Sequence, residues 1–240
     1  MERFEELFID IFRKNGLDQY IRDDIIAKFK TLTDIMIETN AVMNITALTT
    51  LEKIIPLHYA DCVKIAGCIP EGASVIDIGC GGGFPILPLA IVRPDLNITG
   101  LDSTDKKIRY VQKTGDALGL HITTLSARAE DAAKMPDLRD SFDMAISRAV
   151  ARMNVLDELC MPFVKIGGAF VAMKGAAGQE ELDEAVSGIQ KLGGQVVSSI
   201  EYDLHTETDS EKRTVIEVRK ITNTPKEYPR AFGAMKKKPL

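Results

Sequence analysis

The first helix is predicted by apolar residues that recur every three or four positions. They form one face of a helix: Phe4, Leu7, Phe8, Ile11 and Phe12. The pair Asn15-Gly16 comes next, which is a typical helix end. The chain therefore opens with an amphipathic helix whose apolar face needs a partner.

Two further helices are predicted before residue 70. Residues 18–39 form one, because six apolar residues repeat at helical spacing: Ile21, Ile25, Phe29, Leu32, Ile35 and Met36. The other starts near Thr49-Thr50, with Glu52 placed as the capping-box partner. We expect residues 1–70 to be an N-terminal helical extension.

From Ser74 onward, short apolar runs bounded by Gly, Pro and Asp alternate with helical stretches. The predicted strands are 74–78, 97–101, 122–125, 144–146 and 169–173, and the predicted helices are 85–91, 106–118, 155–164 and 180–192. This alternation is typical of right-handed βαβ units and a parallel sheet covered on both faces. The last two strands, 195–202 and 213–220, have no helix between them and should form an antiparallel hairpin. The prediction is an α/β fold with a seven-stranded, mostly parallel Rossmann-like sheet in a domain of residues 71–222.

Charge along the chain changes the first impression of its partners. The 240 residues hold 30 Lys+Arg and 35 Asp+Glu, a net charge of -5, which by itself argues against nucleic acid. Residues 212–240, however, hold nine basic and two acidic side chains, or +7, which leaves -12 for residues 1–211. The basic tail, residues 223–240, either serves solubility or is disordered, or it binds phosphates by counterion release. On the second hypothesis, deleting it weakens affinity for a nucleic acid and flattens the salt dependence of that affinity.

Other classes of protein are disfavoured. No stretch approaches the roughly 20 apolar residues of a membrane span. The start of the chain is acidic rather than a signal peptide. The four cysteines lie far apart, and with three histidines they give neither a zinc spacing nor a disulfide framework. We expect a reduced, cytoplasmic protein without a metal site.

The most specific motif is a glycine loop between a strand and a helix. The strand that ends at Ile78 runs into Gly79, Gly81 and Gly83, which allow sharp turns and close approach of the backbone to a ligand. Asp102 ends the next strand, where it can accept hydrogen bonds from ribose hydroxyls. This order predicts an adenosine-containing cofactor; the alternative is a glycine-rich turn that binds nothing.

The spacing of the loop favours one cofactor over others. A dinucleotide site needs a small residue where Phe84 or Ile86 stands, and a P-loop needs Gly-Lys-Ser/Thr after the glycines. Asp77, two residues ahead of the first glycine, suits a ligand with an ammonium group. The Asp-x-Gly-x-Gly-x-Gly pattern resembles the first motif of class I S-adenosylmethionine-dependent methyltransferases. Such a site needs a polar residue for the adenine edge, for which Glu130 beside Ala129 is our candidate; a solvated acid at a helix start is the alternative.

The residues after the fourth strand constrain the methyl acceptor. Ser147-Arg148-Ala149 replaces the Asn/Asp-Pro-Pro-aromatic run that is usual for exocyclic amino methylation. Carbon-5 methylation needs a cysteine nucleophile, but Cys160 has a core setting and Cys80 is poorly placed. Guanine N7 carries no proton, so its methylation needs alignment and electrostatics rather than a general base.

Several motifs together resemble the bacterial RsmG (GidB) family of 16S rRNA guanine-N7 methyltransferases. The resemblance runs from about Asn40 to Lys220 and rests on these segments: 40–46 with Asn-Ile-Thr, His58-x-x-Asp61, 77–88, 101–103 with Lys106-Lys107, Ser147-Arg148-Ala149 and Met173-Lys174-Gly175. It implies direct in-line methyl transfer from S-adenosyl-L-methionine to a guanine of 16S rRNA, guanine 527 in the standard 16S numbering, without a covalent intermediate. The partner is then 16S rRNA or the small ribosomal subunit. Leu57 stands where many members have Arg.

This resemblance and the motifs together give the candidate site residues. The cofactor pocket is expected to include Asp77, Gly79, Gly81, Gly83, Phe84, Asp102, Ser103, Ala129, Glu130 and Arg148. Arg148 is the candidate for positioning at the transfer site, or else it forms a structural ion pair with Asp143. RNA contacts are expected from Lys174, Arg230, Lys236, Lys237 and Lys238, although Lys174 is equally compatible with a merely exposed lysine. Two alternatives stay open: a class I methyltransferase of a small molecule or protein, and a nucleotide-binding or redox protein with the same fold.

Overall fold

The protein folds around one seven-stranded sheet, as a computed structural model describes for residues 2–240. The strand order is β3-β2-β1-β4-β5-β7-β6, and the first five strands run parallel while β7 is antiparallel to both β5 and β6. The strands are β1 (Ser74–Ile78), β2 (Asn97–Asp102), β3 (Ile122–Ser126), β4 (Phe142–Arg148), β5 (Val164–Lys174), β6 (Gly194–His205) and β7 (Ser210–Lys220). The predicted sheet and its terminal hairpin are confirmed, as is the Rossmann-like class.

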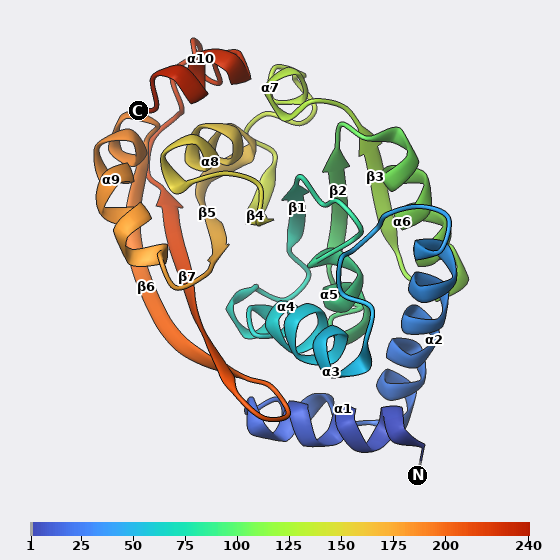
Figure 1. The fold of residues 1–240 in the computed structure, drawn as a ribbon. Helices are drawn as coiled ribbons and strands as arrows, with labels where there is room; N and C mark the ends of the chain where they lie inside the picture. Colours follow the sequence, from blue (N-terminus) through green and yellow to red (C-terminus); the bar gives the residue numbers. More distant parts are fainter. Residues whose placement is uncertain (1) are drawn as a thin grey trace.

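Helices pack on both sides of this sheet (Figure 1). They are α1 (Arg3–Lys14), α2 (Asp23–Asn40), α3 (Leu51–Ile54), α4 (Asp61–Val63), α5 (Ile86–Val92), α6 (Asp105–Ala117), α7 (Ala129–Ala132), α8 (Met153–Cys160), α9 (Gly178–Lys191) and α10 (Phe232–Lys237). Short 3-10 turns lie at 18–20, 66–68 and 161–163, and a π-helical turn spans Ile55–Ala60. Each parallel strand thus alternates with helices, as the sequence predicts.

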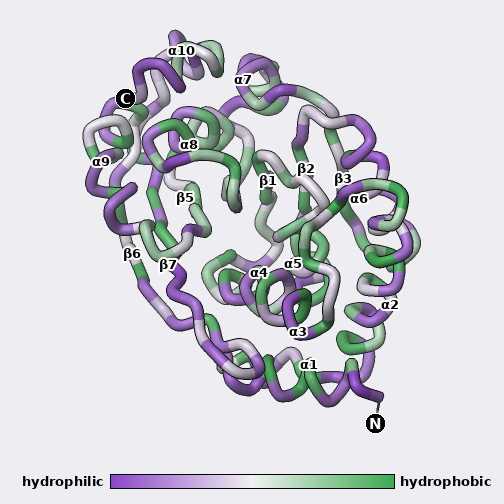
Figure 2. The backbone as a smooth tube through the Cα atoms, in the orientation of Figure 1, coloured by the Kyte–Doolittle hydropathy of each residue, from purple (hydrophilic) through white to green (hydrophobic). Residues whose placement is uncertain are grey.

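Two hydrophobic clusters lie on the two faces of the sheet. One joins the N-terminal helices, α5 and α6 to the face that carries Val75 and Ile146. The other joins α8, α9 and the C-terminal segment to the face that carries Ile76 and Ala145. In Figure 2, hydrophobic residues colour much of α5 and of the central strands. Because side chains alternate along a strand, Asp77 and Arg148 point to the N-terminal side of the sheet.

The first two N-terminal helices pack on each other, and α1 also contacts the terminal hairpin. Phe8 and Phe12 of α1 are fully buried, their rings lie 3.8 Å apart, and both pack on Phe29 of α2. Asn15 exchanges hydrogen bonds with the backbone of His205 at the tip of the β6–β7 hairpin, which reaches α1 in Figure 1. The extension therefore packs as an integral layer of the fold.

Two local expectations were wrong, and one helix was not predicted. The predicted helix 18–39 is interrupted, because the backbone of Arg22 is extended (φ -137°, ψ 146°), and α2 begins at Asp23. Thr50 makes no side-chain capping hydrogen bond at α3, and Glu52 pairs with Arg3 of α1 instead. The tail contains a helix, α10, that its composition did not predict.

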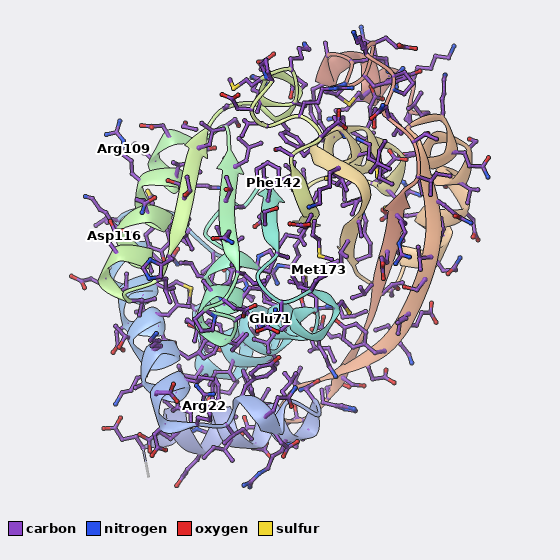
Figure 3. All side chains as sticks on the ribbon, turned by 180° about the vertical axis from the view of Figure 1, so that it is seen from behind. Arg22, Glu71, Arg109, Asp116, Phe142 and Met173 are labelled. Carbon is purple, nitrogen blue, oxygen red and sulfur yellow. The ribbon has the colours of Figure 1, made fainter. Side chains whose placement is uncertain are left out.

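Outer helices keep charged faces toward solvent. In Figure 3, Arg109 and Asp116 point away from α6, and both side chains are exposed. No helix within residues 2–240 is both long enough and apolar enough to cross a lipid bilayer.

Candidate functional site

A cavity of about 440 Å³ lies at the carboxyl ends of the central strands. The strand order reverses between β1 and β4, and in open α/β sheets ligands bind in the crevice at that point. Its volume is within the range of small-molecule and cofactor sites. Eight of the ten predicted cofactor residues line it: Gly79, Gly81, Phe84, Asp102, Ser103, Ala129, Glu130 and Arg148.

The glycine loop forms one wall and requires glycine for two different reasons. Gly79 has φ +77°, and a Cβ there would lie 2.5 Å from Cγ2 of Val150. Gly83 has φ +87°, and a Cβ there would lie 2.4 Å from Cδ1 of Leu87 in α5. Gly79 therefore lets the loop approach the segment after β4 beside the cavity. Gly83, which does not line the cavity, allows α5 to pack.

Asp77 is a buried carboxylate without a protein partner. Its side chain is fully buried in β1, and neither carboxylate oxygen has a hydrogen-bond partner among residues 2–240. Burial raises the pKa of Asp77 well above its usual range, while the positive charge of Arg148 opposes this effect. It does not line the cavity, but it precedes Ile78, which does. An unpaired buried carboxylate fits a cationic ligand such as the ammonium group of a cofactor.

Asp102 braces the glycine loop as well as lining the cavity. Its Oδ2 accepts a hydrogen bond from the Gly81 amide at 3.0 Å, and its Oδ1 accepts one from the Thr104 amide at 2.7 Å. Each oxygen of a carboxylate can accept a second hydrogen bond, so ribose hydroxyls can still bind there. Ser103 lines the cavity beside it and is exposed.

The opposite wall comes from α7 and its N-terminal flank. Ala129 and Glu130 lie in the first turn of this short helix, and the Glu130 side chain is largely buried, with 13% exposed. Glu130 is therefore not the solvated acid that we considered as an alternative. Arg128 is 66% exposed and lies 3.9 Å from the Glu130 carboxylate.

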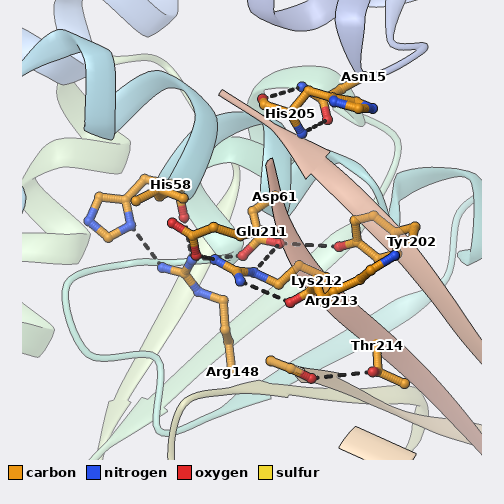
Figure 4. A network of polar contacts seen from close by, with 12 residues as sticks. Asn15, His58, Asp61, Arg148, Tyr202, His205, Glu211, Lys212, Arg213 and Thr214 are labelled. Carbon is orange, nitrogen blue, oxygen red and sulfur yellow. Dashed lines mark hydrogen bonds and ion pairs between the residues drawn. The ribbon is translucent and has the colours of Figure 1, made fainter. Parts of the chain in front are cut away.

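Arg148 is held at the end of β4 by three partners from the N-terminal segment. Nη1 donates to Leu57 O at 2.8 Å and to Asp61 Oδ2 at 3.2 Å, and Nη2 lies 2.9 Å from His58 Nδ1 (Figure 4). The alternative pairing with Asp143 is wrong, because that carboxylate binds Ser74 and pairs with Lys165. The next residue, Ala149, has φ +59°, an unusual conformation for a non-glycine residue. Strain of this kind is common at functional sites.

Asp61 links Arg148 to the terminal hairpin. The side chain of Asp61 is 6% exposed; its Oδ1 accepts a hydrogen bond from the Tyr202 hydroxyl at 3.1 Å and lies 3.5 Å from Arg213 Nε. Burial raises the pKa of Tyr202, an effect to which the Asp61 charge contributes. The network therefore joins the N-terminal helices, β4 and the β6–β7 hairpin around one guanidinium group (Figure 4).

A second, smaller pocket of about 300 Å³ lies on the other side of Arg148. It shares Arg148 and Ala149 with the cofactor cavity. Its further lining residues are Asp61, Ala151, Met173, Lys174, Gly175, Glu181 and Arg213. Arg148 thus lines two adjoining spaces at the same edge of the sheet.

Two of the predicted RNA-binding residues are engaged inside the protein. Lys174 is buried, and its Nζ donates to Ala151 O at 2.6 Å and pairs with Glu181 at 2.8 Å, so the alternative of an exposed lysine is wrong. Arg230 makes a multidentate ion pair with fully buried Glu158. Both side chains hold neighbouring elements together.

The remaining predicted RNA contacts lie at the end of the tail helix beside the cavity. The lysine side chains at 236–238 are exposed. Phe232, in the first turn of the same helix, lines the cofactor cavity. The tail thus reaches the site through Phe232, and its three lysines lie at the other end of the same short helix.

Several cavity residues are not among the predicted site residues, and their signals differ. The one-turn spacing of His58 and Asp61 is compatible with a hydrogen bond that orients the cofactor pocket, but the sequence alone favours an ordinary packed histidine at position 58. Lys107 of α6 and Ile45 of the loop after α2 also line the cavity and fall within resembling segments. Phe232 has no local signal, because only tertiary packing of the tail brings it there.

Comparison with known proteins identifies relatives over the whole chain. The family model described as GidB, rRNA small subunit methyltransferase G, matches residues 25–208. The ribosomal RNA small subunit methyltransferase G of Clostridium perfringens (strain 13) is 40% identical over 238 residues, which cover 97% of this chain and 99% of that protein. The protein of the same name from Clostridium botulinum (strain Loch Maree) is 42% identical over 229 residues, covering 94% and 95% of the two chains.

Solved structures resemble the fold at low sequence identity. A SAM-dependent O-methyltransferase from Thermotoga maritima has a TM-score of 0.53 at 17% identity, over 80% of this chain and 73% of that one. TYW2 from P. horikoshii, solved in complex with MeSAdo, has a TM-score of 0.55 at 13% identity, over 68% and 62%. These similarities support the Rossmann-like fold. The family match and the near full-length relatives show more: the chain belongs to the rRNA small subunit methyltransferase G family, which confirms both the resemblance and the methyltransferase class that the sequence predicts.

Proposed function

We propose that the protein transfers the methyl group of S-adenosyl-L-methionine directly to N7 of a guanine in 16S rRNA. The observation that carries this proposal is the transfer side of the cavity, where Arg148 is held by internal partners and the ionisable neighbours are poor proton acceptors. Burial lowers the pKa of His58 to about 3 and raises the pKa of the Cys80 thiol. A thiol that stays protonated is a poor nucleophile, and a weakly basic imidazole is a poor general base. Guanine N7 needs neither.

The residues present fit the cofactor that the family uses. When bound, S-adenosylmethionine supplies an electrophilic methyl group on a sulfonium. Gly79 and Gly81 would let it approach the backbone, and Asp102 with Ser103 would hold the ribose. Ala129 and Glu130 would meet the adenine edge, and the unpaired carboxylate of Asp77 would compensate the ammonium charge.

The protein's contribution to the reaction is then alignment. Arg148 lies between the cofactor cavity and the second pocket, so it can contact an acceptor base that enters from either space. A fixed guanidinium donates hydrogen bonds in a planar fork, which suits the O6 atom beside guanine N7. Holding the acceptor in line with the methyl group supplies the rate enhancement without a covalent intermediate.

Basic side chains in and near the cavity could contact the phosphates of the RNA backbone. Arg128 and Lys107 line the cavity, and exposed Lys236, Lys237 and Lys238 lie at the end of α10, whose first turn reaches the cavity through Phe232. Phosphate contacts position a nucleic acid without reading its sequence. Since rRNA is a cytoplasmic molecule in bacteria, the proposal also places the protein there.

The experiment is labelled methyl transfer followed by nucleoside analysis. Small ribosomal subunits and naked 16S rRNA from a strain lacking the corresponding enzyme are incubated with the protein and isotope-labelled S-adenosylmethionine. Label in 7-methylguanosine supports the proposal. Label in a different nucleoside, or in protein instead of RNA, contradicts it. Calorimetry with S-adenosylhomocysteine and NAD, where only the former should bind, tests the cofactor separately.

A further inference from the structure

The imidazole of His58 contacts three parts of the site at once. Its Nδ1 lies 2.9 Å from Arg148 Nη2, and its Nε2 lies 2.7 Å from Thr46 Oγ1. Its ring stacks on Phe84 with a centroid distance of 4.1 Å and an interplanar angle of 8°. Phe84 and Arg148 both line the cofactor cavity, as does His58 itself. This ring therefore joins the glycine loop, the end of β4 and the N-terminal segment.

The hydrogen-bond pattern fixes the tautomer of the ring. A guanidinium can only donate, so Nδ1 accepts from Arg148 and the ring proton lies on Nε2. Nε2 then donates to Thr46 Oγ1, which also accepts the Leu48 amide at 3.0 Å. Asn40 in turn holds this loop, because its Oδ1 accepts the amides of Ile45 and Thr46.

The backbone around His58 is shaped to face Arg148. Residues 55–60 form a π-helical turn, in which the Asp61 amide donates to Pro56 O, five residues back. An α-helix would direct that amide to Leu57 O, which here accepts a hydrogen bond from Arg148 at 2.8 Å. Short π-helical turns within helices are frequent at functional sites.

We propose that His58 is a positioning residue for methyl transfer, which acts by fixing the orientation of the Arg148 guanidinium through Nδ1. This rests on the proposed function, in which Arg148 contacts the acceptor base. Without the Nδ1 acceptor, the guanidinium keeps its contacts to Asp61 and Leu57 through Nη1 but loses the one that holds Nη2. Rotation of the fork then misaligns the acceptor while leaving the ion pair in place.

Two substitutions separate this role from packing. Asn places its side-chain oxygen close to the position of Nδ1, whereas Gln places its polar end near Nε2. H58N therefore keeps an acceptor for Arg148, and H58Q keeps only the contact to Thr46. Both remove the stack on Phe84, so any effect of that stack on cofactor binding is common to the pair.

The test is the single-turnover rate of methyl transfer to small subunits with saturating cofactor and RNA. We expect H58Q to be at least tenfold slower than wild type, H58N to stay within threefold, and both to bind S-adenosylhomocysteine with dissociation constants within twofold of each other. In an R148Q background, H58Q should slow the residual rate less than twofold, because the residues act through one contact. Thermal unfolding and S-adenosylhomocysteine binding establish that each variant is folded.

The opposite pattern overturns the proposal. Equal rates in H58N and H58Q assign His58 to packing, and a large loss in H58N alone assigns it to the Thr46 loop. A full additional loss from H58Q in the R148Q background shows that it acts independently of Arg148. If the wild type itself transfers no methyl group, the proposed function is refuted. That outcome is distinct from a failure of the role proposed for His58.

Discussion

At the scale of single residues, the described part of the chain contains two buried carboxylates whose burial its own residues do not compensate, and one of them, Asp77, lies next to the site. Asp77 has no hydrogen-bond partner within residues 2–240, and burial raises its pKa well above the usual range. A group with a raised pKa in the folded state destabilises the fold as pH rises above its unfolded value. A cationic ligand would remove that cost. We therefore expect Asp77 to lower the stability of the ligand-free protein and to raise its affinity for a cationic cofactor.

Replacing Asp77 by Asn should separate these two effects. We expect D77N to unfold at a higher temperature than the ligand-free wild type, with a difference that grows from pH 5 to pH 8. The same variant should bind S-adenosylhomocysteine at least tenfold more weakly, since a charge-assisted hydrogen bond contributes about 1.5–3 kcal/mol. Thermal unfolding and calorimetry measure the two quantities. Unchanged affinity would show that Asp77 does not meet the cofactor.

Asp157 of α8 is a second such group, away from the cavity. It is fully buried, its Oδ2 has no partner among the described residues, and burial raises its pKa to about 8. The folded protein therefore holds this proton to a higher pH than the unfolded chain does, and stability falls as pH rises from about 4 toward 8. We expect the gain in unfolding free energy from D157N to grow by about 1 kcal/mol per pH unit in this window. Urea unfolding at several pH values measures the unfolding free energy of D157N and wild type. A difference between the two that does not change with pH would contradict this prediction.

At the scale of elements, the alternation of strands and helices could be predicted from the sequence. The contacts with distant segments that hold the site residues in place could not. The glycine loop, Asp102 and the Ser147-Arg148-Ala149 segment can be found from local patterns because each stands at the end of a strand. The partners of Arg148 come from an N-terminal turn about ninety residues away, where the pattern predicts an ordinary helix. Lys174 is buried because Glu181 and Ala151 O surround its ammonium group, which no local pattern reveals.

The packing of the C-terminal segment could likewise not be predicted from its local sequence. Its composition suggested a charged tail, but Tyr228 and Met235 are buried against α8 and α9 and Phe232 reaches the cavity. The deletion of residues 223–240 considered from the sequence is therefore a poor test of RNA binding. It would also expose the core and leave the buried carboxylate of Glu158 unpaired.

Breaking the Arg230–Glu158 pair tests whether the segment is anchored. R230Q should destabilise the protein by about 3 kcal/mol, because it leaves an unpaired charge in a buried position. The double variant R230Q/E158Q should recover part of this loss. Urea unfolding gives both values, and S-adenosylhomocysteine affinity should fall in R230Q as Phe232 leaves the cavity rim. A loss below about 0.5 kcal/mol, the size of an ordinary surface substitution, would mean that the anchor is unimportant.

At the scale of the whole molecule, the charge asymmetry of the sequence is largely neutralised locally. Five of the nine cations in residues 212–240 form ion pairs, namely Lys212, Arg213, Arg219, Lys220 and Arg230. The other four, Lys226, Lys236, Lys237 and Lys238, are exposed. Three of these lie at the C-terminal end of α10, whose first-turn residue Phe232 lines the cavity, so a net charge of -5 is compatible with a cationic approach to the site.

The triple variant K236Q/K237Q/K238Q tests this approach without disturbing the core. Each lysine that contacts a phosphate contributes about 0.7–0.9 to the slope of log affinity against log salt. We expect the slope for small subunits or 16S rRNA to fall by two to three and the affinity at low salt to fall at least tenfold. The matched control K28Q/K53Q/K113Q, which changes exposed or partly exposed lysines elsewhere, should leave the slope unchanged. Equal slopes for both triple variants would remove the tail helix from the RNA interface.

The central claim is methyl transfer to guanine N7 at one position of 16S rRNA, and chemical mapping tests it most directly. Small subunits from a strain lacking the corresponding enzyme are incubated with the protein and S-adenosylmethionine, then treated with borohydride and aniline, which cleave the chain at 7-methylguanosine. We predict one new, cofactor-dependent primer-extension stop, at guanine 527. No new stop, or stops scattered over many guanines, would contradict the account.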